Sequence, residues 1–153
     1  MGRWLERRRH PVRDVLYPIV TGPVIAGLKA FLTGRDESYA SSVAVSRVLP
    51  PAAERTTRMV TVRDDGGPQV GVQERRQLGF NVWAESTVNG ELLARLLMAG
   101  VQSLPDGDPI TFVDEVNGPF EVVDTQSDLL VVSGVTLAHY FFTARVSARG
   151  TDL

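Results

Sequence analysis

The sequence predicts an α+β domain, in which two main helices pack on one face of a mainly antiparallel β-sheet. The first observation is the segment 76–86, where apolar and polar residues alternate strictly before an apolar-periodic helix begins at Val88. The second is the order of elements along the chain, which is a helix, strands, a long helix and more strands. That order is typical of an antiparallel sheet whose helices lie on one face.

Length and composition indicate one soluble domain. The chain has 153 residues, of which 43% are apolar and 22% charged, as in an ordinary globular protein. It contains no cysteine, which excludes disulfides, thiolate zinc sites and cysteine nucleophiles. No uninterrupted apolar run approaches the ~20 residues of a membrane span. We therefore expect a protein that is neither exported nor bound to a membrane.

Residues 1–17 are predicted to form a basic N-terminal arm, followed by a single α+β domain over residues 18–153. Five arginines, at positions 3, 7, 8, 9 and 13, lie within the first thirteen residues, although the net charge of the chain is −2. His10-Pro11 interrupts any helix there. One interpretation is a solvated arm. The other is an arm that orders against a neighbouring subunit or against phosphates. Trp4 and Leu5 are costly to leave in water, and arginine pairs with both carboxylate and phosphate groups.

The first helix is expected between Pro18 and Thr33. Its apolar residues follow spacings of four, four and three, which places them on one face: Val20, Val24, Leu28 and Phe31. Pro18 suits a first helical turn, and Gly34 suits the left-handed position after a helix end. Pro23 predicts a break, with the firm part of the helix running from there to Thr33.

The remaining elements are strands and one long helix. Strands are expected at 43–48, 58–63, 76–85, 110–116 (resuming at 120–123), 129–132 and 136–149. Residues 64–74 are expected to be an exposed loop or hairpin tip, and Ser86 or Thr87 to cap the long helix. Its apolar stripe comprises Leu92, Leu93, Leu96, Leu97, Val101 and Leu104.

Two strands define the predicted core. Leu78, Phe80, Val82 and Ala84 point to one face, so Trp83 points to the other, where it packs under a loop or meets a partner. The last strand turns a second apolar series to the core: Ala138, Tyr140, Phe142, Ala144, Val146 and Ala148. Because its second face is also half apolar, this strand is expected at the centre of the sheet.

No catalytic, cofactor-binding or metal-ligating residues are predicted. His139 has no second ligand or nucleophile motif beside it. The neighbouring pairs Asp64-Asp65 and Asp114-Glu115 are expected to point to opposite faces of their strands, so that neither pair shares a substrate. The glycines form neither a dinucleotide-binding fingerprint nor a P-loop. We therefore expect a protein without enzymatic activity and without a cofactor.

Several segments together resemble a known family. They are the helix 24–32, the Val-rich strand ending at Pro50-Pro51, Met59-Val60-Thr61-Val62-Arg63 before a Gly-Gly turn, Phe80-Asn81-Val82-Trp83-Ala84 before the leucine-rich helix, the Asn117-Gly118-Pro119 turn, and the strand ending 140–146. In this order they resemble the tail terminator proteins of long-tailed bacteriophages, small α+β proteins that end tail-tube growth. The resemblance covers about residues 18–149. The basic arm is longer than expected for that family.

The resemblance implies a structural virion protein that is made in the host cytoplasm and sits at the head-proximal end of the phage tail. It implies a homohexameric ring that binds the tail tube protein on one face and head-completion proteins on the other. Double-stranded DNA would pass through the lumen without sequence-specific binding. Subunit contacts are expected at sheet edges, at the loops 64–74 and 106–109, and at five residues: Trp4, Arg7, Arg8, Arg9 and Trp83.

Other functions remain open at this point. A head-to-tail joining protein of the same particle would share the size, the symmetry and the lack of chemistry. A small α+β enzyme would use His139 and Arg145 on an anionic substrate, and would have a deep pocket. Nucleic-acid binding through the arm would weaken steeply with salt and would vanish when residues 1–13 are removed.

Overall fold

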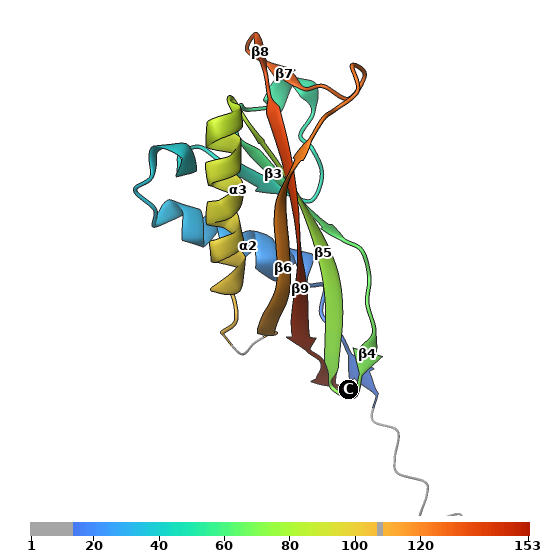
Figure 1. Ribbon diagram of the computed structural model, residues 1–153. Coiled ribbons are helices and arrows are strands. Elements are labelled where there is room, and N and C mark those ends of the chain that lie inside the picture. The colour runs from blue at the N-terminus through green and yellow to red at the C-terminus, as the bar shows by residue number, and fades with distance from the viewer. Residues whose placement is uncertain (1–13, 107–108) are drawn as a thin grey trace, which may run out of the picture.

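The computed structural model describes residues 14–106 and 109–153, and its centre is a twisted sheet (Figure 1). The strand order is β2-β3-β5-β9-β6, and a short β4 pairs with the end of β5. All pairs are antiparallel except β2 with β3. The strands are β2 (Ala44–Ser46), β3 (Met59–Asp64), β4 (Gln69–Val70), β5 (Gln73–Ala84), β6 (Ile110–Val122) and β9 (Ala138–Arg149).

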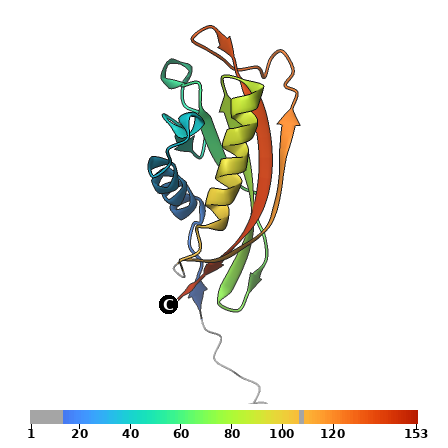
Figure 2. The ribbon, with the colours of Figure 1, turned by 60° about the vertical axis from the view of Figure 1, so that its left-hand side comes forward.

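Two helices, α2 (Thr21–Thr33) and α3 (Thr87–Gln102), lie on the same side of this sheet (Figure 2). Short 3₁₀ helices occur at Ser38–Ala40 and Ala52–Glu54. A small hairpin joins β7 (Val131–Val132) to β8 (Val135–Thr136), and β1 (Val15–Leu16) pairs with β10 (Thr151–Asp152). The predicted α+β class, with a mainly antiparallel sheet, is confirmed. Residues 15 and 16, which the sequence assigned to the arm, are therefore paired with the end of the domain.

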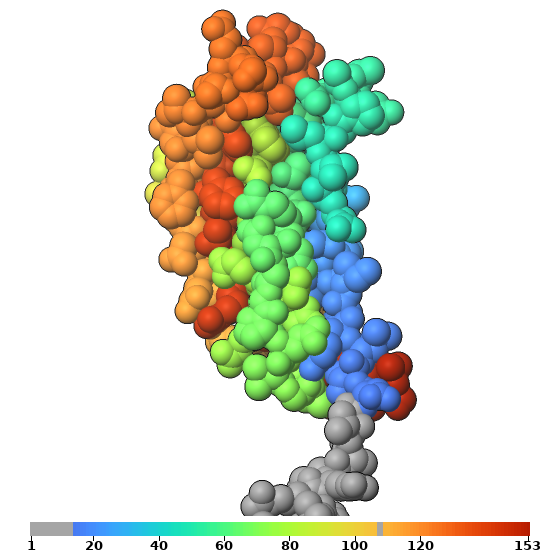
Figure 3. All heavy atoms as spheres, turned by 90° about the vertical axis from the view of Figure 1, so that its right-hand side faces the viewer, coloured from blue at the N-terminus to red at the C-terminus, as the bar shows by residue number. Residues whose placement is uncertain are grey.

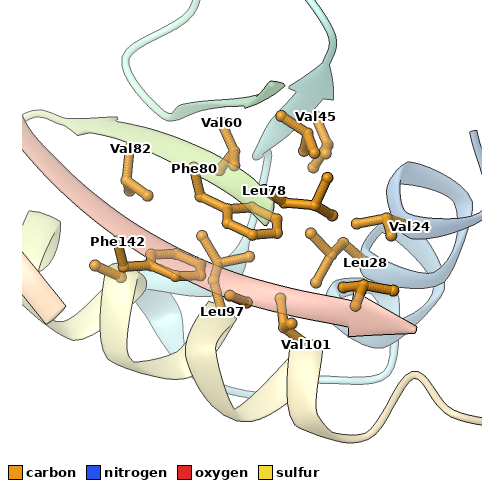
Figure 4. Packing of buried hydrophobic residues seen from close by; sticks show 14 of the residues in the cluster. Val24, Leu28, Val45, Val60, Leu78, Phe80, Val82, Leu97, Val101 and Phe142 are labelled. Carbon is orange, nitrogen blue, oxygen red and sulfur yellow. The ribbon is translucent and has the colours of Figure 1, made fainter. Parts of the chain in front are cut away.

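The main core lies between the helices and the sheet (Figure 4). At its centre the rings of Phe80 and Phe142 stack with their centroids 4.5 Å apart, and both side chains are fully buried. The helices contribute Val24 and Leu28 from α2, and Leu93, Leu97 and Val101 from α3. The alternation predicted for residues 78–84 and 138–148 therefore assigned the core face of β5 and β9 correctly, and β9 lies inside the sheet between β5 and β6.

The first helix ends at Thr33 as predicted, but it differs from the prediction at its start and in the conformation of Gly34. It begins at Thr21 instead of Pro18, so Pro23 falls in the first turn, where its missing N–H leaves no hydrogen bond unmade, and no break occurs. At the other end Gly34 has φ −83°, outside the left-handed region, and its N–H donates to the Ala30 carbonyl over 3.3 Å. The apolar spacing located the helix correctly. The proline and glycine rules were wrong about where it begins, about a break at Pro23 and about the backbone conformation of Gly34.

Pairing with β9 also lengthens strands beyond their apolar patterns. Strand β5 begins at Gln73, inside the segment predicted as a loop, and its polar start pairs with the end of β9. Strand β6 continues through the predicted turn at 117–119, but its register against β9 shifts at three places. The apolar run 129–132 forms part of the β7–β8 hairpin, and the last long strand begins at Ala138 because Thr136 belongs to β8.

Gly90 allows α3 to approach β9 closely. A Cβ atom at this position would lie 2.9 Å from the ring of Tyr140, a buried side chain of β9. We expect Gly90→Val to lower the free energy of unfolding by about 1–3 kcal/mol, because the ring and the helix must move apart. Urea unfolding measures the loss. Gly22→Val is the control, since nothing lies within 4 Å of a Cβ at Gly22; an equal loss there would show that helix propensity, and not packing, is responsible.

The N-terminus of α3 is held by a polar network. Ser86 caps the helix by accepting a hydrogen bond from the Asn89 N–H. The preceding Glu85 accepts from Arg58 over 2.6 Å and from the Asn89 amide over 2.8 Å. Arg58 also donates to the Ser38 carbonyl over 2.6 Å. The network thus connects β3, the first 3₁₀ helix and α3, and both members of the ion pair are largely shielded from water.

This network predicts a pH-dependent contribution to stability. The hydrogen bonds from Arg58 lower the pKa of Glu85 from 4.5 to about 2. A carboxyl whose folded-state pKa is depressed stabilises the fold above its unfolded pKa, and this stabilisation is lost as the pH falls through the folded value. We expect Glu85→Gln to be less stable than the wild type above pH 4.5, and the difference to shrink as the pH falls towards about 2.

Urea midpoints over this pH range test that expectation. Glu91→Gln is the matched control, because Glu91 forms an exposed i,i+4 pair with Arg95 that contributes little. A loss at Glu85 that does not vary with pH would assign the effect to the shape of the side chain and not to its charge.

Candidate functional site: the helix-free face of the sheet

The face of the sheet opposite the helices is uncovered over most of its length. Figure 3 shows this face, with β6, β9 and β5 exposed side by side as orange, red and green bands. Across it, the strand register aligns Thr61, Asn81, Phe141 and Phe120 in one row. Because neighbouring strands place paired residues on the same face, these side chains project together away from the core.

Aromatic side chains are the main apolar feature of this face. Phe112 and Phe120, both on β6, are 56% and 54% exposed. The Phe141 ring lies over Gly79, where a Cβ would be only 3.1 Å from the ring, and the Arg63 guanidinium lies 5.8 Å from the ring centroid. Two exposed phenylalanines on one strand are unusual for a surface that faces only water, and they mark a candidate contact surface.

An ion cluster lies between the two exposed phenylalanines of β6. Arg145 on β9 contacts both Asp114, over 2.8 Å, and Glu115, over 3.1 Å. The hydrogen bonds from Arg145 lower the pKa of Asp114. The prediction that these neighbouring carboxylates point to opposite faces was therefore wrong. Glu115 has φ 48° and lies within a register shift of β6, which turns both side chains towards the same guanidinium.

Trp83 also lies on the side away from the helices, but its own chain covers it. Only 6% of the residue is exposed, and it packs with Met59, Val132 and Leu137 in a second, smaller core. Its ring stacks on His139 with centroids 4.5 Å apart. Of the two interpretations of Trp83, packing under a loop therefore describes its environment, and the predicted subunit contact would have to displace the β7–β8 region.

His139 is held on both ring nitrogens. Its Nδ1 lies 2.9 Å from an Asp124 carboxylate oxygen, and its Nε2 lies 2.8 Å from the Asn81 side-chain oxygen. With its ring also stacked on Trp83, the imidazole has no nitrogen directed at a substrate. Arg145, the other residue of the enzyme alternative, is occupied by Asp114 and Glu115. These two residues are thus used in structural contacts.

A hollow of about 550 Å³ lies elsewhere, between the C-terminal part of α2 and β2. Its polar lining comes from Lys29, Thr33, Arg35, Ser41 and Ser42, and Val43 and Val45 supply part of the rest. Neither His139 nor Arg145 contributes to it. In residues 14–106 and 109–153, no group of three or more His, Asp or Glu side chains is arranged to hold a metal ion.

The predicted arm contacts fall outside the described residues. Trp4, Arg7, Arg8 and Arg9 all precede Asp14, and the predicted contact loop 106–109 includes two positions that are not described. The loop 64–74 is described: Asp64 accepts from Arg76, and Arg63 contacts Asp65 over 2.6 Å. Its charges are therefore paired within the chain.

Neither of the described helices is long and apolar enough to cross a membrane. No protein-family model matches the chain, and no curated protein matches its sequence.

Proposed function

We propose that this protein is a tail terminator: a structural virion protein that caps the tail tube of a long-tailed bacteriophage, ends its polymerisation and connects the tail to the head-completion proteins. It acts as a homohexameric ring with double-stranded DNA in the lumen. The protein is made in the host cytoplasm and resides at the head-proximal end of the tail. Its mechanism is binding, without cofactor and without bond chemistry.

The observation that carries the proposal is the open side of the sheet at β6. This strand is 13 residues long and pairs with β9 on one side, while no described residue pairs with its other side. Exposed Phe112 and Phe120 project from the same strand. A long edge strand with apolar side chains is a template for association, which natural monomers generally cover or shorten. The α+β fold itself agrees with the fold that the family resemblance implies.

Formation of a ring also requires two different contact patches on the surface of each subunit. Rotational symmetry repeats one heterologous contact, in which two different patches of neighbouring subunits meet, until the ring closes. The open side of β6 supplies one such patch. The tube and the head-completion proteins then bind the two flat faces of the ring.

Light scattering of the protein, alone and mixed with purified tail tubes, followed by electron microscopy of tube ends, tests the proposal. We expect a ring of six times the chain mass of 16.7 kDa, or capped tube ends where the ring forms only on the tube. Tubes from an unrelated phage serve as the control. Added tube protein should then fail to lengthen capped tubes.

The results separate the alternatives. A ring that binds head connectors but leaves tubes growing identifies a joining protein of the same particle. A stable monomer or dimer that ignores tubes overturns both assignments.

A further inference from the structure

We infer that residues 1–13 of one subunit bind along β6 of the neighbouring subunit, across Phe112, the Asp114–Glu115 pair and Phe120. This surface is called the β6 stripe below. The inference rests on the proposed ring, because it names the two patches that meet at each subunit contact. The N-terminal arm is one patch and the β6 stripe is the other.

The charges of the chain are segregated in a way that matches this contact. Residues 1–13 contain five arginines and one glutamate, a net charge of +4. Residues 96–144 contain seven aspartates and glutamates and neither lysine nor arginine. Strand β6 lies inside that acidic segment and carries Asp114, Glu115 and Glu121. Opposite charges on two patches steer the patches together and fix their register.

The negative charges of β6 are only partly neutralised by residues of the same chain. Asp114 and Glu115 share the single guanidinium of Arg145, so one negative charge remains. Glu121 is exposed too, but it pairs with the core-side Tyr140 and therefore lies on the helix side of β6, outside the stripe. An arginine from another subunit would neutralise the remaining charge of the Asp114–Glu115 pair, since a guanidinium offers two parallel donors to a carboxylate.

The aromatic part of the β6 stripe suits the same arm. The chain already places guanidinium groups near phenylalanine rings, Arg63 at 5.8 Å from Phe141 and Arg35 at 5.6 Å from Phe31. In the described part of the chain, the exposed rings of Phe112 and Phe120 have no guanidinium group near them. Arginines of the arm can stack on these rings, and Trp4 and Leu5 supply apolar surface that can pack beside them.

The attachment point of the arm allows it to reach a neighbouring subunit. The described chain begins at Asp14, whose carbonyl accepts a hydrogen bond from the Leu153 N–H beyond the end of β9. Strand β1 is antiparallel to β10, so the chain enters β1 from beyond the end of the sheet. Thirteen extended residues span at most about 45 Å, enough to reach another subunit of a ring.

A photo-crosslinker tests the contact in the full chain. Phe120 is replaced by p-benzoylphenylalanine, the sample is irradiated alone and on tail tubes, and crosslinked peptides are identified by mass spectrometry. We expect a covalent dimer in which the probe joins residues 1–13. The same probe at Val88, exposed on α3, is the positional control and should give no arm crosslink.

Charge reversal then tests the recognition. Arg7→Glu/Arg8→Glu/Arg9→Glu, or Asp114→Arg/Glu115→Arg, should each lower the dimer yield by about tenfold or more, and the two sets combined in one chain should restore it. Reversing three cations outside the arm, with Lys29→Glu/Arg47→Glu/Arg149→Glu, should not lower it. If a variant does not fold, the wild-type crosslink map still decides.

The outcomes distinguish this contact from the proposed function. Oligomers whose probe joins other segments, or joins the arm of its own chain, overturn the contact and leave the terminator proposal standing. Arm crosslinks in a protein that never caps tubes overturn the terminator proposal alone. A chain that remains monomeric with and without tubes overturns both.

Discussion

Phe80→Ala is expected to lower the free energy of unfolding by about 3–5 kcal/mol, because it removes a fully buried ring from the centre of the core. The ring stacks on Phe142 between β5 and β9 and faces the leucines of α3, so its loss leaves a cavity with little freedom to collapse. A domain of this size has about 5–15 kcal/mol in total. The variant should therefore unfold at much lower urea concentration, as monitored by circular dichroism.

Phe120→Ala is the matched control for this variant. It removes the same ring from the opposite face, where more than half of the residue is exposed, and should change stability by about 0.5 kcal/mol or less. A loss below about 1 kcal/mol for Phe80→Ala would contradict the core described above. The Phe120 variant also distinguishes a role in subunit association from a role in folding, since its effect should appear only in association.

The sequence predicted the parts of the fold that depend on local periodicity. Alternation at Leu78, Phe80 and Val82 identified the core face of β5, because a strand turns successive side chains to opposite faces and only one face is covered by helices. The predicted apolar stripe identified the buried side of α3 at Leu93, Leu97 and Val101 for the same reason, although Leu92 of that stripe is exposed. The fold class followed from the order of these elements.

Features that depend on pairing between distant strands could not be predicted in this way. The joint contact of Asp114 and Glu115 with Arg145 arises from a register shift of β6, which no periodicity reports. The polar start of β5 is a strand because β9 lies beside it. The Arg58–Glu85 pair joins residues 27 positions apart.

The candidate site was predictable only in part. The half-apolar second face of the last predicted strand, with Leu137 and Phe141, indicated a strand at the centre of the sheet. That the Trp83 end of this face is covered by its own chain, while the Phe120 side is open, depends on where the β7–β8 hairpin packs. Sequence reasoning therefore selected Trp83 as a contact and missed Phe112 and Phe120, whose exposure follows from their position on an edge strand.

Trp83→Ala is expected to lower the free energy of unfolding by about 3–5 kcal/mol, because the indole is the largest member of the second core. Its loss leaves Met59 and Leu137 without their shared neighbour and removes the ring that stacks on His139. Trp83→Phe should lose less, since a phenyl ring keeps the stacking. Urea unfolding of both variants, followed by circular dichroism, measures the two losses.

Val131→Ala provides the control in the adjacent hairpin, where the side chain is mostly exposed, and should be close to neutral. The comparison also decides the role of Trp83 in assembly. If Trp83 serves the fold, Trp83→Phe should retain ring formation in proportion to its stability. If Trp83→Ala instead leaves the urea midpoint unchanged and abolishes association, the indole is a subunit contact, and the β7–β8 region must move aside when subunits meet.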